Sequence, residues 1–116
     1  MRAMVRQGAR ASKTQALLGP SIGPCCYEVD GELAKRFERR FAGTHAHIQP
    51  SDRSGKAYLD LRAIVADQLA VASLERDAIQ SIGPCTKCAA DKYFSRRAAG
   101  GTVTGLQLSF IGRFVA

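Results

Sequence analysis

The sequence predicts a mixed α/β fold, part of an α-β sandwich with a mixed sheet. Two segments carry apolar residues at the three- to four-residue spacing of an amphipathic helix. Three shorter apolar runs end at glycine and proline or alternate apolar with polar residues, as strands do. Three strands are few for a sheet that is covered on both faces. We therefore expect the 116 residues to be an incomplete part of a larger domain.

The amino-terminal segment predicts the end of a helix followed by a strand. Residues 3–13 have the pattern of a helix end, with Gly8 as the stop signal. Residues 15–24 begin as a short apolar strand and end in two Gly-Pro pairs. Regular structure should stop at these pairs, because proline fixes its own φ and disfavours helix in the residue before it.

Residues 29–41 predict the first long helix. Leu33, Phe37 and Phe41 are spaced four residues apart and would form one apolar face. Asp30 precedes them as the expected N-cap, because its carboxylate can accept the free N–H groups of the first turn.

A predicted loop separates this helix from the second one. Residues 42–56 are rich in turn-forming residues, and residues 58–74 then return to helical spacing. Asp60 is the expected cap of the second helix. The residues that would share its buried face are Leu61, Ile64, Val65, Gln68, Leu69 and Ala72.

The carboxy-terminal third predicts two more strands around a compact polar segment. Residues 78–84 are a short apolar run that ends at Gly-Pro, and residues 85–97 are the polar segment. Residues 104–114 alternate apolar with polar side chains, which predicts a strand with one buried face. That face would contain Leu106, Leu108 and Phe110.

The net charge of +7 does not by itself indicate a nucleic-acid partner. The basic residues lie in separate parts of the chain, and no aromatic residues alternate with them as a stacking surface requires. We therefore expect a solvated basic surface and no nucleic acid. No run is long and apolar enough for a membrane, and the basic start lacks the apolar core of a secretory signal. The expectation is a cytoplasmic protein with reduced thiols.

Four cysteines leave more than one reading open. Cys85 and Cys88 form a Cys-x-x-Cys, and a zinc module would need Cys25 and Cys26 as the other pair. Adjacent side chains diverge in most backbones, so we favour Cys25, Cys26 and Cys85 as small, half-buried apolar residues at strand ends. A thioredoxin-type motif is disfavoured because Gly-Pro precedes Cys85.

The histidines and one arginine pair are the other candidates. His45 and His47 form His-x-His in the predicted loop, and we expect them to be solvated surface residues rather than zinc ligands. Arg96 and Arg97 precede a Gly-Gly turn and could hold a phosphate or carboxylate bidentately, although an exposed basic turn fits equally well. No base and nucleophile pair is evident, so no catalytic residue is assigned from the chemistry alone.

Four stretches of the chain follow one another in a recognisable order. They are residues 17–33, LLGPSIGPCCYEVDGEL; residues 58–69, with Leu-Asp-Leu opening a helix; residues 85–97, with Cys-Thr-x-Cys and the paired arginines; and residues 104–112. Together they resemble the laccase-domain family, also called the polyphenol oxidase family, whose members are known as purine nucleoside phosphorylases. The repeated Ser-Ile-Gly-Pro-Cys then falls in two different strand-end loops, not in a duplication.

The resemblance implies that residues 1–116 are the C-terminal half of one such domain. The family's zinc site, of one cysteine and two histidines, lies in motifs absent from this sequence, so no metal ligand is transferred and no cofactor is expected on this chain alone. Arg96 or Arg97 is implied as a substrate contact, although Leu106 stands where the family has a further arginine. The implied activity is phosphorolysis of adenosine or inosine, with possible adenosine deamination, and the fragment should be inactive.

Two non-catalytic alternatives stay open beside the enzyme fragment. The chain could pair with its missing N-terminal half or with a second copy as a homodimer. It could also be a small zinc module built on the four cysteines.

Overall fold

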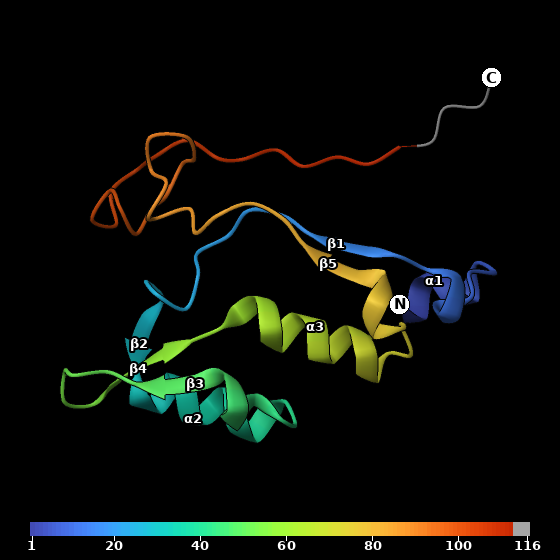
Figure 1. Cartoon of the computed structure of the whole chain (residues 1–116), viewed down its shortest axis with the longest axis horizontal. Helices are drawn as coiled ribbons and strands as arrows, with labels where there is room; N and C mark the ends of the chain where they lie inside the picture. The colour runs from blue at the N-terminus through green and yellow to red at the C-terminus, as the bar shows by residue number, and fades with distance from the viewer. Residues whose placement is uncertain (113–116) are drawn as a thin grey trace.

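Two small β-sheets organise residues 1–112, the part of the chain that the computed structural model describes (Figure 1). One is a parallel pair of β1 and β5, and the other is antiparallel in the order β2-β4-β3. The mixed α/β class is thus confirmed, with the parallel and antiparallel pairings in two separate sheets. The strands are β1 (Ala16–Leu18), β2 (Glu28–Asp30), β3 (Ile48–Pro50), β4 (Lys56–Leu59) and β5 (Ile79–Ser81).

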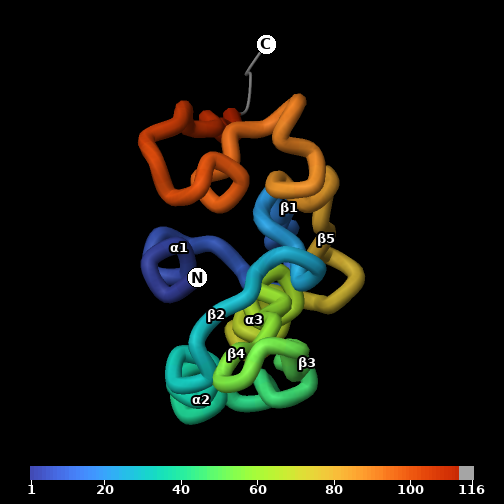
Figure 2. The backbone as a smooth tube through the Cα atoms, turned by 90° about the vertical axis from the view of Figure 1, so that its left-hand side faces the viewer, coloured from blue at the N-terminus to red at the C-terminus, as the bar shows by residue number. Residues whose placement is uncertain are grey.

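The two longer helices are packed on different parts of this framework. Helix α2 (Gly31–Arg40) contacts β2 and β4, and α3 (Leu61–Val71) contacts β5. Figure 2 shows β1 and β5 running side by side in the middle of the view, with the antiparallel sheet and α2 below them. The shorter helical turns are α1 (Arg2–Arg6), η1 (Ala11–Lys13), η2 (Thr44–His47) and η3 (Arg76–Ala78). None of the helices in residues 1–112 has the length and apolarity that a membrane crossing requires.

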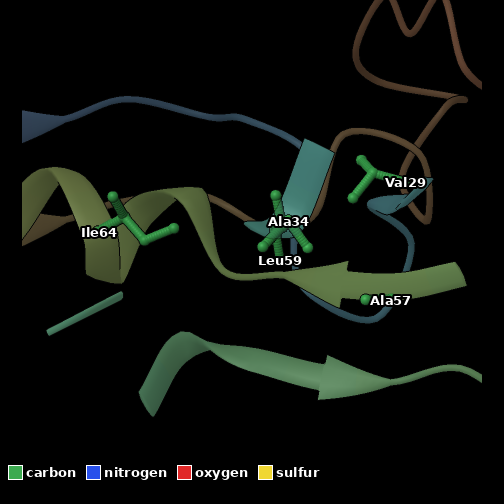
Figure 3. Close-up of a cluster of buried hydrophobic side chains, with 5 residues drawn as sticks. All are labelled: Val29, Ala34, Ala57, Leu59 and Ile64. Carbon is green, nitrogen blue, oxygen red and sulfur yellow. The ribbon is translucent and has the colours of Figure 1, made fainter. Parts of the chain in front are cut away.

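The hydrophobic core lies between α2, the antiparallel sheet and the start of α3 (Figure 3). Leu59 is completely buried there. The predicted apolar face of α2 packs against this core through Leu33, Phe37 and Phe41. This confirms the interpretation of the four-residue spacing. The buried residues of the core are Val29, Ala34, Ala57, Leu59 and Ile64.

The two predicted helix caps have different outcomes. Asp60 accepts the backbone N–H of Ala63 at 3.0 Å, as expected. Asp30 occupies the N-cap position of α2 but makes no side-chain cap bond. Its carboxylate instead pairs with Lys56, because Asp30 is also the last residue of β2 and lies opposite Lys56 in the sheet.

Two strands, β3 and β4, lie where the sequence predicted loop or helix. The predicted loop 42–56 contains η2 and β3, and the predicted helix 58–74 begins only at Leu61. Tyr58 and Leu59 belong to β4 instead. Strands of three or four residues show too little alternation to be recognised locally, and here they form by pairing with one another.

The strand predicted at 104–114 is wrong for the residues that the structure describes. Residues 103–112 form no strand, and Leu106, Leu108 and Phe110 are 86–90% exposed. A strand requires a neighbour to satisfy its N–H and C=O groups, and none of the described segments pairs with this one. Residues 113 and 114 of the prediction lie outside the described part.

Candidate functional site

The two Gly-Pro loops leave the parallel sheet at the same edge and stay together. Strands β1 and β5 pair with Leu18 opposite Ser81, and beyond them Ser21 forms a further parallel bridge with Cys85. The N–H of Thr86 donates to the carbonyl of Ser21 at 3.1 Å. The two Ser-Ile-Gly-Pro-Cys copies are therefore neighbouring, staggered strand ends, which explains why both use the same turn residues.

Arg62, in the first turn of α3, ties the two loops together. Its Nε donates to the hydroxyl of Ser21 at 2.7 Å, and its Nη2 donates to the carbonyl of Ser21 at 2.9 Å. The same guanidinium reaches the other loop, with bonds to the carbonyls of Pro84 at 2.8 Å and Gly83 at 2.9 Å. Sequence reasoning missed this residue, because nothing near Arg62 in the chain shows which carbonyls it will meet.

The paired loops bring all four cysteines into one cluster. Their sulfur atoms lie within 4.8 Å of one another, with Sγ of Cys88 3.7 Å from that of Cys25 and 3.5 Å from that of Cys26. The expectation that adjacent cysteines diverge is wrong here, because Cys25 and Cys26 occupy a tight turn. In that turn the N–H groups of Cys26 and Tyr27 both donate to the carbonyl of Gly23 at 3.0 Å.

The burial of the cysteines only partly matches the prediction of half-buried apolar residues. Cys26 and Cys85 are half-buried, as predicted, whereas Cys25 is exposed; Cys88, which that prediction did not include, is exposed as well. Small apolar residues at strand ends would be covered, so exposure of two thiols weakens the purely structural interpretation of the cluster.

The thiols of the cluster influence one another. Burial, together with hydrogen bonds to Cys88 and Cys25, raises the pKa of Cys26 to about 12. Burial would also raise the pKa of Cys85, but hydrogen bonds from surrounding backbone N–H groups lower the pKa to about 6. At neutral pH the cluster therefore combines a thiolate at Cys85 with a protonated thiol at Cys26.

The two histidines differ in their exposure and in their contacts. His45 is exposed, as expected, whereas His47 is half-buried and its Nε2 lies 2.7 Å from Oδ2 of Asp67. The other carboxylate oxygen of Asp67 accepts a bond from Arg76 at 2.9 Å. Hydrogen bonds from His47 and Arg76 lower the pKa of Asp67. In the His-x-His pair, His45 is thus solvated, whereas His47 links η2 to α3 through Asp67.

Arg96 and Arg97 line a hollow of about 410 Å³ beside the cysteine loops. Arg97 donates from Nη1 to the carbonyl of Glu28 at 2.7 Å, and its guanidinium carbon lies 5.3 Å from the centre of the Tyr27 ring. Arg96 donates from Nε to the carbonyl of Gly101 at 3.3 Å. Both arginines are exposed, and their role in substrate binding stays a prediction. The hollow is lined by Ile22, Tyr27, Thr86, Phe94, Ser95, Arg96, Arg97 and Gly101.

Comparison with known proteins places this geometry in context. Residues 1–114 match the family described as multi-copper polyphenol oxidoreductase laccase. Adenosine deaminase RL5, from an unknown prokaryotic organism, is 33% identical over an alignment of 107 residues, and the match covers 89% of this chain and 41% of that protein. Purine nucleoside phosphorylase YlmD of Geobacillus stearothermophilus is 32% identical over 108 residues, 93% of this chain and 39% of that protein.

The solved structure of the Geobacillus protein supports the same relationship. It superimposes with a TM-score of 0.75 at 28% identity, covering 85% of this chain and 37% of that one. The chain therefore spans about two fifths of the length of the relatives that it matches.

The described residues do not form a copper electron-transfer centre of the histidine and cysteine type. Copper electron-transfer centres combine two histidines with one cysteine. In residues 1–112 the metal-ligating side chains that gather in one place are four cysteines, without a histidine. Matched over residues 1–114 and similar to its relatives in both sequence and structure, the chain belongs to the multi-copper polyphenol oxidoreductase laccase family.

Proposed function

We propose that this chain is part of an enzyme that cleaves purine nucleosides with phosphate. In that reaction phosphate attacks C1 of the ribose, the bond from C1 to the base breaks, and ribose 1-phosphate and free base leave. Two lines of support are the relatives named purine nucleoside phosphorylase and adenosine deaminase. Adenosine deamination, in which water replaces the amino group, is the second activity that we propose for the complete domain.

The observation that carries the proposal is the hollow beside Tyr27. It gathers the guanidinium groups of Arg96 and Arg97 with the hydroxyl-bearing residues Thr86 and Ser95. Such a set suits a phosphate, because arginine presents N–H groups in a planar fork that matches two phosphate oxygens. The aromatic rings of Tyr27 and Phe94 at the same hollow suit the flat apolar faces of a nucleoside.

The contacts of the two arginines leave donors for an anion. Described residues engage one N–H of Arg97, at Nη1, and one of Arg96, at Nε. A guanidinium has five N–H groups, so most of them stay available. Stacking of Arg97 on Tyr27 also restricts its plane, which lowers the entropy lost when an anion binds.

We further propose that catalysis needs a polypeptide segment equivalent to the rest of the relatives. The chain spans about 41% of the deaminase relative, and the family's zinc-ligand motifs are not in this sequence. On this proposal the chain supplies the phosphate side of the pocket and is inactive by itself. We place the protein in the cytoplasm, where four reduced thiols persist.

The test compares the chain alone with a completed domain. The completed domain joins residues 1–116 to the amino-terminal part of the Geobacillus relative, and hypoxanthine release from inosine is measured with and without phosphate. We expect no release above a blank from the chain alone, and phosphate-dependent release from the completed protein. Arg97→Gln should raise the KM for phosphate at least tenfold, whereas Arg36→Gln, an equal charge change on exposed α2, should not. Turnover by residues 1–116 alone, or turnover independent of phosphate, would refute the proposal.

A non-catalytic pairing role is the second candidate, and one observation favours it. Val103, Leu106, Leu108 and Phe110 expose 86–101% of their surface along one extended segment. Apolar side chains exposed together in this way usually mark a surface for another polypeptide. Light scattering after size exclusion measures whether the chain is monomeric or associated. A homodimer, or a complex with a separately produced amino-terminal half, supports this role. A soluble monomer that does not bind that half contradicts it.

A further inference from the structure

We propose that Cys25, Cys26, Cys85 and Cys88 form a structural zinc site that clips the two Gly-Pro loops together. The site would take a divalent ion of the zinc class through four thiolates. This inference is independent of the proposed nucleoside chemistry, because the cluster does not include the arginines of the hollow.

The spacing of the sulfur atoms is that of a tetrathiolate site. Zinc binds thiolate at about 2.3 Å with tetrahedral geometry, so two sulfurs on the same ion lie about 3.8 Å apart. The sulfur of Cys88 lies 3.7 Å from that of Cys25 and 3.5 Å from that of Cys26. All four sulfurs lie within 4.8 Å of one another. Small side-chain rotations would therefore complete the tetrahedron.

The donor set indicates both the metal class and the role. Four cysteines with no carboxylate or histidine select soft or borderline ions such as zinc. A site with four protein ligands has no open position for water or substrate, so it stabilises structure and does not catalyse.

The backbone around the cluster leaves room for the ligands to approach one another. A side chain at Gly23 would place its Cβ 3.2 Å from Cβ of Cys85 and 3.4 Å from Sγ of Cys25. Glycine at this position is therefore what allows the first loop to lie against the second. A larger side chain here would require Cys85 or Cys25 to move by a few tenths of an ångström.

The position of the clip connects it to the hollow. Tyr27 directly follows Cys26, and Thr86 lies between Cys85 and Cys88. Both residues line the hollow that holds the arginines. A metal on the four thiolates would therefore fix two walls of the hollow while lying outside it.

The first experiment measures metal and ligand directly on the unmodified chain. Residues 1–116 are purified with reductant, loaded with zinc, dialysed and assayed for zinc and protein. We expect about one zinc per chain, and X-ray absorption should show four sulfur neighbours at about 2.3 Å. Cobalt in place of zinc should give the visible spectrum of tetrahedral thiolate coordination.

Variants then identify the ligands. Cys88→Ser should weaken zinc binding at least tenfold, whereas His45→Ala, which removes an exposed imidazole outside the cluster, should bind zinc as the parent does. Circular dichroism of each variant checks folding, and the absorption spectra of the parent chain decide the ligand set even if Cys88→Ser fails to fold. The proposal is overturned by less than about one-tenth zinc per reduced chain, by fewer than three sulfur ligands, or by unchanged affinity in folded Cys88→Ser. The proposal is also overturned if two of the cysteines form a disulfide even under reductant and the chain then no longer binds zinc.

Discussion

Replacing Arg62 by methionine keeps most of the aliphatic stem but removes all four hydrogen bonds that join the Gly-Pro loops. Two of these bonds, to the hydroxyl and carbonyl of Ser21, are partly buried, and the two to Gly83 and Pro84 are exposed. A net hydrogen bond contributes about 0.5–1.5 kcal/mol, and exposed acceptors recover part of their loss by binding water. We assign about 1 kcal/mol to each partly buried bond and about half of that to each exposed one. The expected loss in the free energy of unfolding is about 3 kcal/mol.

Urea unfolding followed by circular dichroism measures this loss, with a metal chelator present so that the cysteines cannot compensate. Arg62→Lys keeps the charge but not the planar fork, so it should recover less than half of the lost stability. Arg36→Met on the exposed face of α2 is the matched control and should change stability by less than about 0.5 kcal/mol. A loss below about 0.5 kcal/mol in Arg62→Met, or full recovery by lysine, would refute the reasoning that this guanidinium holds the loops together.

Two further predictions concern Gly83 in the second Gly-Pro loop and the contact of Asp67 with His47 and Arg76. Gly83→Ala should destabilise by about 2 kcal/mol in the same urea assay, because Gly83 has φ +78° and a Cβ there would lie 2.9 Å from Cγ of Pro20; an unchanged midpoint would contradict this. The pKa of Asp67 is lowered by His47 and Arg76, so its contribution is present above the unfolded pKa near 3.9 and is lost as pH falls through the folded value. Asp67→Asn should therefore be up to about 1 kcal/mol less stable than the parent at pH 6, and this difference should shrink as pH falls below about 4. A difference that does not shrink with falling pH would count against the pairing.

The sequence was most informative where local patterns determine structure. The spacing of Leu33, Phe37 and Phe41 identified the buried face of α2, and Asp60 was identified as a cap. Both signals act within two or three helical turns, so they do not depend on the rest of the fold. The Gly-Pro pairs likewise marked the ends of β1 and β5 correctly.

The features that sequence reasoning missed or disfavoured depend on contacts between distant segments. Cys25 and Cys88 are 63 residues apart, and they meet only because β1 and β5 pair in parallel and the first loop turns at Gly23. The position of Arg97 on Tyr27 depends on the same approach. The alternation of residues 104–112 is a case where a local pattern was misleading. It predicted a strand, but no described segment pairs with these residues.

The parallel pairing of β1 with β5 has a consequence for the order of folding. The antiparallel strands, α2 and the start of α3 lie between the two paired strands in the sequence and have their own buried core. Contacts within that insert are local, whereas joining β1 to β5 closes a long loop at an entropic cost that grows with its length. We expect the insert to nucleate and the two loops to meet late. Any species populated before that step would have a formed core but would keep the Cys25-Cys26 pair apart from Cys85 and Cys88, with the thiols open to oxidation.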